Sequence, residues 1–403
     1  MRIPLLSIVI TIFFTLLTDW YIWADVRYYS RKSRNPRRWP MIYAVSAVIC
    51  WIYITVVLLL PRRGESSIIH VMWLLYAYLT IYVPKFIYLI FSLIGRIRFG
   101  KRKKRNGIGT YVGLPVAAIV FGLMWWGALV TRNQTNINRV EITSANLPAG
   151  FDGFKIVQFS DAHTGTWGND TSFVSRMVDS INALNPDLIV FTGDLVNRRS
   201  EEAIPFMPAL SRLKATHGVI SVLGNHDYGD YMNWPSEDAK MNNRQALCMM
   251  QKQMGWTLLN NENIRLRQRI DSIVVIGVEN WGEPPFHQYG DLKKSYPQLN
   301  DSCFKLLLSH NPEHWRLEVT KKSNIDLTLS GHTHAMQMMV SAGNHKWSPA
   351  SWRYKQWAGL YEATNPANTS MQLYVNIGAG TVGLPFRIGA TPEITLLTLR
   401  KKK

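Results

Sequence analysis

Residues 155–163 read KIVQFSDAH, a short strand-like run that ends directly in an aspartate and a histidine. The same arrangement occurs five times before residue 335, and each run ends in side chains of a type that binds metal. The five are Lys155–Phe159 before Ser160-Asp161-Ala162-His163, Leu188–Phe191 before Thr192-Gly193-Asp194, Val219–Leu223 before Gly224-Asn225-His226-Asp227, Lys305–Leu308 before Ser309-His310, and Ile325–Leu329 before Ser330-Gly331-His332-Thr333-His334. Such runs are typical of strands buried on both faces, and layered folds place ligand-binding side chains where the strands end. Helical periodicity over residues 171–184 and 203–213 provides covering layers, so the sequence predicts a layered α/β domain.

The residue types at these strand ends suit a site for two divalent ions. Asp, Asn and His without Cys favour borderline-to-hard metals such as Mn, Fe or Zn over a thiolate site. Hydrolysis of a phosphate ester needs neutralised phosphoryl oxygens and a strong nucleophile at neutral pH. Two ions roughly 3.5–4 Å apart supply both, because they clamp the oxygens and deprotonate a bridging water. The five blocks contain enough side chains to hold two such ions.

In this order the blocks read D-x-H, G-D, G-N-H-D, H and G-H-x-H, and they resemble the calcineurin-like metallophosphoesterases. The resemblance extends over roughly residues 139–399 and implies a four-layer αββα sandwich. One departure follows the last block. Ala335-Met336-Gln337 stands where the family usually has Gly-Gly-Gln, a change expected to alter the substrate entrance and not the metals.

Carried over position by position, the resemblance implies seven metal ligands and two catalytic residues. One ion would be bound by Asp161, His163 and His334, the other by Asn225, His310 and His332, with Asp194 bridging both. His226 would lie beside the scissile phosphate as general acid or transition-state donor, and Asp227 would orient its imidazole. The expected cofactors are two ions of Mn, Fe or Zn, and the expected attacking group is a hydroxide that bridges them.

The front of the chain predicts a membrane region. Four apolar stretches, at about residues 3–24, 41–60, 68–94 and 108–130, have the length of about 20 residues that a helix needs to cross a bilayer. We therefore expect an all-α transmembrane domain over residues 1–131, a polar linker over 132–138, and the metallophosphoesterase domain over 139–403.

The charge distribution predicts the orientation of that region. Residues 1–131 hold 17 Lys and Arg against 3 Asp and Glu, out of 45 and 27 in the whole chain. Most of this excess lies in the first and third loops, whereas the second loop has only Arg62 and Arg63. Because positive loops stay in the cytoplasm, both termini and the catalytic domain should lie on the extracytoplasmic face. The back half is nearly neutral, so the lipid bilayer is the expected partner and nucleic acid is not.

Several further features leave two interpretations open. Asp19 and Lys85 interrupt the apolar stretches and either form an intramembrane ion pair or reach the interface separately. The aromatic and basic segment 344–361 either lies on the membrane surface or caps the core. Arg387 either contacts a phosphate or makes a surface salt bridge. Cys248 and Cys303 form a pair only in an oxidising compartment, and Cys50 is expected to be packed in an apolar run.

The function predicted from these observations is hydrolysis of phosphodiester or pyrophosphate bonds by a membrane-anchored, two-metal phosphoesterase. Anchoring alone suggests a lipid or lipid-linked substrate. One alternative is a nucleotide phosphodiesterase or nuclease, which the near-neutral domain disfavours. A second is a catalytically inactive membrane receptor or scaffold, which the complete set of ligand positions disfavours. A third interpretation makes the spans a transporter that the soluble domain regulates. A membrane anchor is the simpler interpretation, because one Asp and one Lys in the spans provide few polar groups for a transport pathway.

Overall fold

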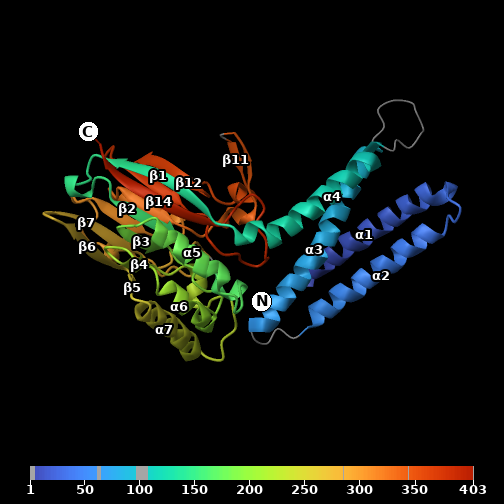
Figure 1. Ribbon diagram of the computed structural model, residues 1–403, viewed down its shortest axis with the longest axis horizontal. Coiled ribbons are helices and arrows are strands. Elements are labelled where there is room, and N and C mark those ends of the chain that lie inside the picture. The colour runs from blue at the N-terminus through green and yellow to red at the C-terminus, as the bar shows by residue number, and fades with distance from the viewer. Residues whose placement is uncertain (1–4, 61–64, 97–107, 285, 344, 403) are drawn as a thin grey trace. The chain divides into compact units, whose positions relative to one another are not determined.

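The computed structural model describes residues 5–60, 65–96, 108–284, 286–343 and 345–402. The chain forms two compact units, a helical unit up to Leu129 and an α/β unit from Val130 (Figure 1). Each is described by itself. The basic residues Arg62 and Arg63 of the second predicted loop, and those of stretch 98–105 in the third, lie outside the described residues.

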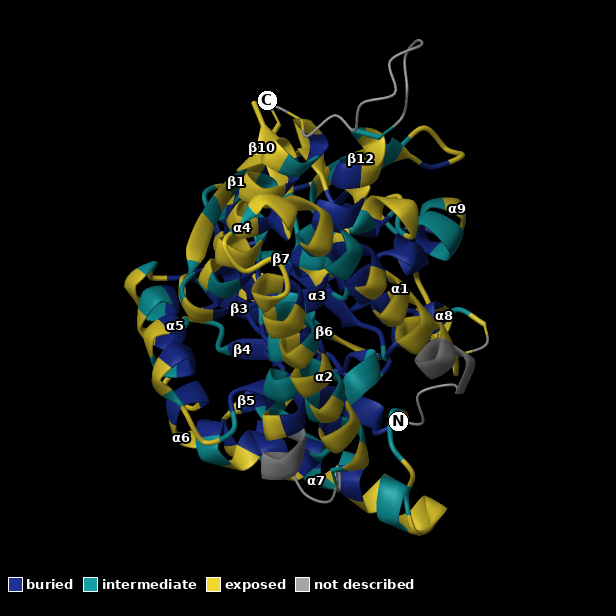
Figure 2. Cartoon of the chain, turned by 90° about the vertical axis from the view of Figure 1, so that its right-hand side faces the viewer, coloured by how far each residue is buried: buried dark blue, intermediate teal, exposed yellow. Residues whose placement is uncertain are grey.

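Four long helices form the first unit: α1 (Leu5–Tyr29), α2 (Arg38–Leu59), α3 (Glu65–Ile94) and α4 (Ile108–Leu129). Three segments of the described chain are long and apolar enough to cross a membrane: Arg38–Leu59, Ile69–Ile94 and Ile108–Asn133. The described part of α1 carries the charges of Asp19, Asp25 and Arg27. Much of the surface of α2 is exposed although it is apolar, as expected for a helix that faces lipid (Figure 2). The predicted all-α membrane region is confirmed, with three of its four helices meeting the length and composition of a span.

A buried polar cluster ties α1 to α2 and α3. The carboxylate of Asp19 pairs with Lys85 Nζ at 2.9 Å and accepts hydrogen bonds from the hydroxyls of Tyr43 and Tyr82 at 2.6 and 2.7 Å. Trp51 Nε1 also donates to it at 3.1 Å. The ion-pair interpretation is therefore confirmed. Four donors around one buried carboxylate satisfy a group that would otherwise be costly to hold among apolar side chains.

A second polar cluster lies further along α1, around Asp25, just beyond residue 24 where the predicted first span ends. Asp25 accepts hydrogen bonds from Tyr88 Oη at 3.0 Å and Ser92 Oγ at 2.9 Å, and it pairs with Arg96. It enters the helix because α1 continues to Tyr29, five residues beyond the predicted end.

Two six-stranded sheets form the centre of the α/β unit (Figure 1). The first has the order β1 (Asn136–Ser144), β14 (Glu393–Lys401), β2 (Lys155–Phe159), β3 (Leu188–Phe191), β4 (Val219–Ser221) and β5 (Trp256–Leu258). The second has the order β12 (Gly359–Thr364), β13 (Ser370–Val375), β9 (Leu327–Ser330), β8 (Lys305–Leu308), β7 (Asp271–Gly277) and β6 (Glu262–Gln268). A separate hairpin pairs β10 (Val340–Ala342) with β11 (His345–Trp347).

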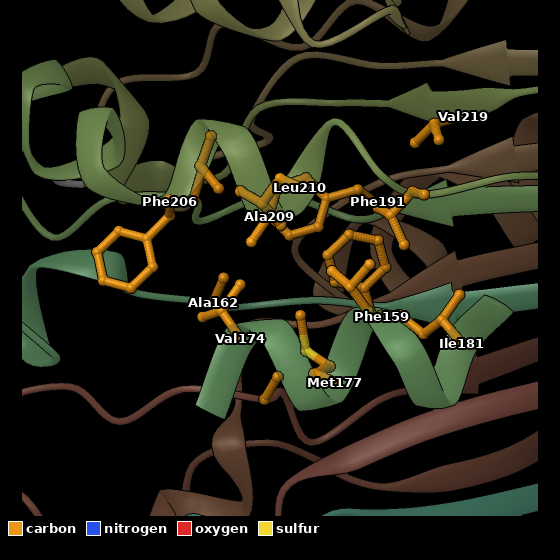
Figure 3. Packing of buried hydrophobic residues seen from close by; sticks show 14 of the residues in the cluster. Phe159, Ala162, Val174, Met177, Ile181, Phe191, Phe206, Ala209, Leu210 and Val219 are labelled. Carbon is orange, nitrogen blue, oxygen red and sulfur yellow. The ribbon is translucent and has the colours of Figure 1, made fainter. Parts of the chain in front are cut away.

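The sheets stack through their central strands, which bury apolar side chains on both faces. In β3, Leu188 and Val190 face the core between the sheets, whereas Ile189 and Phe191 face the outer helices. The helices on this outer side are α5 (Ser172–Ala183), α6 (Met207–Leu210) and α7 (Glu237–Gln253). Figure 3 shows Met177 and Ile181 of α5 beneath Phe159. Each fully buried side chain of this kind contributes roughly 1.5–3 kcal/mol.

The outer side of the second sheet is covered in the same way. A third cluster joins β7, β8 and β13 to α8 (Leu292–Ser295) and to the π-helical turn Trp315–Val319, which is followed by α9 (Thr320–Lys322). The order of layers is helices, sheet, sheet, helices, so the predicted four-layer αββα sandwich is confirmed.

The first strand differs from the sequence prediction. β1 begins at Asn136, inside the stretch 132–138 that its polar composition assigns to a linker, and it pairs in parallel with β14 from Asn136↔Glu393 onward. As an edge strand it buries only Ile142, so its sequence keeps the polar character of a loop.

Candidate metal centre

The five predicted strand ends meet along one edge of the sandwich. β2, β3 and β4 run parallel, as do β8 and β9. The carboxyl ends of parallel neighbours lie together, which brings the side chains that follow them into one place. The structure gathers there all seven predicted ligands, together with His226 and Asp227.

One group of candidate ligands lies around Asp161. Its Oδ1 is 3.2 Å from Nε2 of His334, and that nitrogen is 3.1 Å from Nε2 of His163. Nε2 of His163 is in turn 3.6 Å from Oδ2 of Asp194. These four side chains are buried, and one ligand atom of each lies within 4.8 Å of those of the others.

The second group shares Asp194 with the first. Oδ2 of Asp194 lies 3.2 Å from Nε2 of His310, and Nδ1 of His332 lies 3.2 Å from that same nitrogen. Oδ1 of Asn225 is 3.0 Å from Nε2 of His310 and 2.8 Å from Nδ1 of His332. Asp194 therefore lies between the two groups, as the sequence predicts for a bridging carboxylate.

Neighbouring groups fix which ligand atoms face inward. Nδ1–H of His310 donates to the Thr192 carbonyl oxygen at 2.8 Å, which turns Nε2 toward Asp194. The amide of Asn225 donates to Tyr231 Oη at 2.7 Å, which directs its oxygen toward the histidines. Nε2 of His332 lies 3.1 Å from Tyr354 Oη, leaving Nδ1 for the cluster. Partners of this kind orient metal ligands.

Sequence reasoning missed Tyr231 and Tyr354. They lie between the motif blocks, and a single tyrosine in a loop gives no periodic or spacing signal.

The electrostatics of the site match a cation. Burial opposes protonation of His310, but the Asp194 carboxylate outweighs it and raises the pKa of His310 to about 9. Burial and the neighbouring His310 lower the pKa of His332 to about 3. Burial would raise the pKa of Asp194, yet the surrounding imidazoles hold it well below its usual range. The ionised Asp194 and the neutral His332 are already in the forms that bind divalent metal, whereas His310 would have to lose a proton when an ion binds, so the donor set fits such an ion with release of that proton.

His226 lies beside the first group, with its ring 4.9 Å from that of His163. Its backbone N–H donates to Oδ1 of Asp194 at 2.8 Å, and its ring stacks on Tyr231 at 4.3 Å. Nδ1–H donates to the Asn197 carbonyl oxygen at 2.8 Å. His226 is half-buried, whereas His163 and His310 are fully enclosed.

Asp227 has a different role from the predicted one. Its carboxylate accepts hydrogen bonds at 2.9–3.2 Å from four backbone N–H groups, those of Asp194, Leu195, Val196 and Gly224. The imidazole of His226 is oriented by the Asn197 carbonyl instead. Burial and the adjacent Asp194 raise the pKa of Asp227 to about 7. Asp227 therefore organises the backbone of the two loops that carry Asp194 and His226.

Comparison with known proteins gives the family. Residues 154–336 match the family described as Calcineurin-like phosphoesterase, and residues 1–132 match the one described as Probable Calcineurin-like phosphoesterase, transmembrane domain. The uncharacterized metallophosphoesterase YkuE of Bacillus subtilis is 32% identical over 272 residues, which cover 64% of this chain and 83% of that protein. The chain belongs to the calcineurin-like metallophosphoesterases. It is therefore a metal-dependent phosphoric ester hydrolase with a transmembrane region.

Two other relatives of this metallophosphoesterase bear on its setting. A transmembrane protein with metallophosphoesterase domain from Bos taurus is 30% identical over 286 residues, 68% of this chain and 59% of that protein. The UDP-2,3-diacylglucosamine pyrophosphatase LpxG of Chlamydia muridarum is 25% identical over 271 residues, 58% of this chain and 79% of that protein.

The metallophosphoesterase site is built on unusual backbone. Five of its candidate ligands have positive φ: Asp161 at 52°, His163 at 43°, Asp194 at 61°, His332 at 76° and His334 at 51°. Such conformations cost about 1–3 kcal/mol each and persist where the surroundings hold them. Ala335 and Met336, which replace the usual glycines, also have positive φ, at 49° and 45°. The altered motif thus keeps the glycine-like backbone and adds an exposed Met336 side chain.

Close approach of the loops requires glycine next to two ligands. A Cβ at Gly331 would collide with Oδ2 of Asp161, and one at Gly193 would lie 2.9 Å from Nδ1 of His310.

Arg387 is fully buried, which excludes a surface salt bridge. Its guanidinium donates to the carbonyl oxygens of Gly380, Ile377 and Ala390, and one nitrogen lies 3.2 Å from Nδ1 of His334. It holds the loop after β13 against the first ligand group. Cys50, Cys248 and Cys303 are all free thiols.

Proposed function

We propose that this metallophosphoesterase hydrolyses phosphodiester or pyrophosphate bonds with two divalent ions held at the site described above. The observation that carries the proposal is the convergence of seven candidate ligands from five strand ends, six of them grouped around the seventh, Asp194. Asp161, His163 and His334 would hold one ion, Asn225, His310 and His332 the other, and Asp194 both. Bound ions of Mn, Fe or Zn would neutralise the phosphoryl oxygens and lower the pKa of a water molecule enough to supply the nucleophile.

The chain's own residues would move the proton to the leaving group. Because Nδ1–H of His226 is engaged with the Asn197 carbonyl, Nε2 is the atom available to substrate. In the imidazolium form that nitrogen donates a proton to the departing oxygen, and afterwards the neutral ring keeps its Nδ1 proton.

The setting of the enzyme suggests the class of substrate. A transmembrane domain over residues 1–131 would keep the catalytic domain, whose first strand starts at Asn136, close to a bilayer. The relative LpxG is named for pyrophosphate hydrolysis of a diacylated sugar nucleotide. Both points favour a phosphate ester carried by a lipid. The positive first and third loops favour an extracytoplasmic site for the reaction.

The test uses the full chain, purified in detergent and loaded with Mn²⁺. Hydrolysis of a chromogenic phosphodiester and of a phosphomonoester is measured for the wild type, Asp194→Asn, His226→Ala and the control His217→Ala, a half-buried histidine that precedes β4. We expect Asp194→Asn to lose metal and activity together. His226→Ala should keep its metal while turnover falls about 10²–10⁴-fold, the usual contribution of a general acid.

Activity that survives Asp194→Asn would overturn the two-ion site. Metal binding without hydrolysis of any phosphate ester, including lipid-borne ones, would favour the receptor alternative.

A further inference from the structure

An apolar patch stands out on the α/β unit, away from the sheets. It is formed by Val340, Trp347 and Trp352, which are 53%, 42% and 80% exposed. Val340 and Trp347 are directly opposite in the β10–β11 hairpin, and the rings of Trp347 and Trp352 meet edge to face at 5.6 Å. The hairpin projects from the rest of the unit in Figure 1 and is coloured as exposed at β10 in Figure 2. Two tryptophans kept together in water are costly unless a partner covers them.

The patch is attached to the metal centre by short, buried contacts. Ser348 Oγ donates to the Ala335 carbonyl oxygen at 2.6 Å, and Thr333 Oγ1 donates to that of Trp357 at 2.6 Å. Ser348 is itself buried. Between these contacts the chain passes through the 3₁₀ turn η9 (Pro349–Trp352) to Tyr354, whose hydroxyl lies 3.1 Å from His332. The exposed tip therefore has a rigid base that ends at a candidate ligand.

The charge of the segment identifies the partner. Residues 338–357 contain three Lys and Arg and no Asp or Glu. Lys346 and Lys355 are exposed and flank Trp347 and Trp352 in the sequence, and Arg353 pairs with Glu283. Tryptophan beside lysine is the composition of surfaces that rest at the headgroup level of a bilayer, and basic residues favour anionic lipids.

We propose that the patch of Val340, Trp347 and Trp352 is a membrane-interface anchor that inserts its tryptophans among anionic lipid head groups. The transmembrane helices of the same chain tether the α/β unit to a bilayer, so lipid head groups are available to the patch. The anchor places the loop of Tyr354 and His332 at the level of the lipid phosphates. The substrate class then follows as a phosphate ester on a lipid head group, a step that rests on the proposed function.

The contact between the patch and the lipid head groups is measured by fluorescence, independently of hydrolysis. Cys50, Cys248 and Cys303 are replaced by Ala in the full chain, and Ser351→Cys, in η9 next to the patch, is labelled with an environment-sensitive fluorophore. Ile270→Cys, in the fully exposed β6–β7 turn, is the matched control. Both proteins are reconstituted in nanodiscs of phosphatidylcholine with or without phosphatidylglycerol, and with doxyl-labelled lipid as quencher.

We expect blue-shifted, quenched emission at position 351 and unquenched emission at position 270. Quenching at 351 should be stronger with phosphatidylglycerol and should be lost when Trp347→Ala and Trp352→Ala are combined. Equal quenching with and without the tryptophans, or a water-like spectrum at 351, would overturn the anchor and would favour a protein partner for the patch. Hydrolysis is scored separately in the same samples, so a failure of the proposed function leaves the contact result standing.

Discussion

The Nδ1–H of His226 donates to a main-chain carbonyl, and this one bond decides which ring nitrogen is left for substrate. A carbonyl oxygen cannot take up a proton at neutral pH, so the ring keeps the same tautomer throughout a reaction cycle. Asp227, the neighbouring carboxylate, holds the loops by accepting four backbone N–H groups. His226 is therefore placed for proton transfer, whereas Asp227 holds the loops and should matter mainly for stability.

Asp227→Asn should destabilise the protein and its metal site together. An asparagine oxygen can replace Oδ1, but its NH₂ group faces the backbone N–H groups of Asp194 and Gly224 and cannot accept from them. Two unsatisfied buried donors cost about 1–3 kcal/mol each. We expect a clear drop in thermal midpoint and a lower metal content by elemental analysis.

His226→Ala is the matched control, because it removes a half-buried ring and leaves these loop hydrogen bonds in place. If Asp227→Asn kept its stability and changed only the turnover, the carboxylate would act through the imidazole after all.

Motif spacing predicted the residues of the site itself, but it did not predict the neighbouring residues that orient them. The nine predicted residues are all brought together, because ordered blocks at strand ends determine both identity and place. The supporting groups, Asn197, Tyr231 and Tyr354, could not be predicted. One acts through its backbone carbonyl, which every residue type provides, and the tyrosines reach the site through loop paths that leave no pattern.

At the scale of elements, apolar composition explains which parts of the fold the sequence reveals. β3 is buried on both faces and is a continuous apolar run, while β2 and β8 are almost wholly buried and contain only Lys155, Gln158 and Lys305 as polar residues. β1 and the β10–β11 hairpin are largely exposed, so their residues alternate or are polar and resemble loops. The positive φ angles at the ligands were equally hidden, because Asp and His carry no signal for that conformation as glycine does.

The polar cluster around Asp19, which joins α1 to α2 and α3, should stabilise the packing of these three helices. Asp19→Asn and Lys85→Met should each lower the thermal stability of the full chain in detergent, because each leaves the other partner buried without its counter-charge. The double variant should lose less than the sum, by about 0.5–3 kcal/mol of coupling. Ser46→Ala, an exposed position on α2, serves as the control. Additive losses would mean that the tyrosines and Trp51 satisfy Asp19 without help from the lysine.

For the whole molecule, a membrane domain and an αββα phosphoesterase share one chain, and the side of the bilayer on which phosphate esters are cleaved depends on how the helices insert. The first and third loops carry most of the basic residues of the membrane region, whereas the second has only Arg62 and Arg63. Positive loops are retained in the cytoplasm, so four crossings, with α1 counted as the span that the sequence predicts, would leave both termini outside. The helical unit is compatible with this insertion, since the loop between α1 and α2 starts and ends with basic residues.

We therefore expect alkaline phosphatase, which folds only outside the cytoplasm, to be active when fused after Lys403 and after Arg63. It should be inactive when fused within the first loop, after Arg34, where a cytoplasmic reporter such as green fluorescent protein should instead fluoresce. Exchanging the basic residues of the first loop for Gln while adding Lys to the second should weaken or reverse this pattern, because the K/R bias is its cause. An inactive phosphatase at the C-terminus, with a fluorescent protein active there, would place the metal centre in the cytoplasm. The substrate would then have to be a phosphate ester of the inner leaflet.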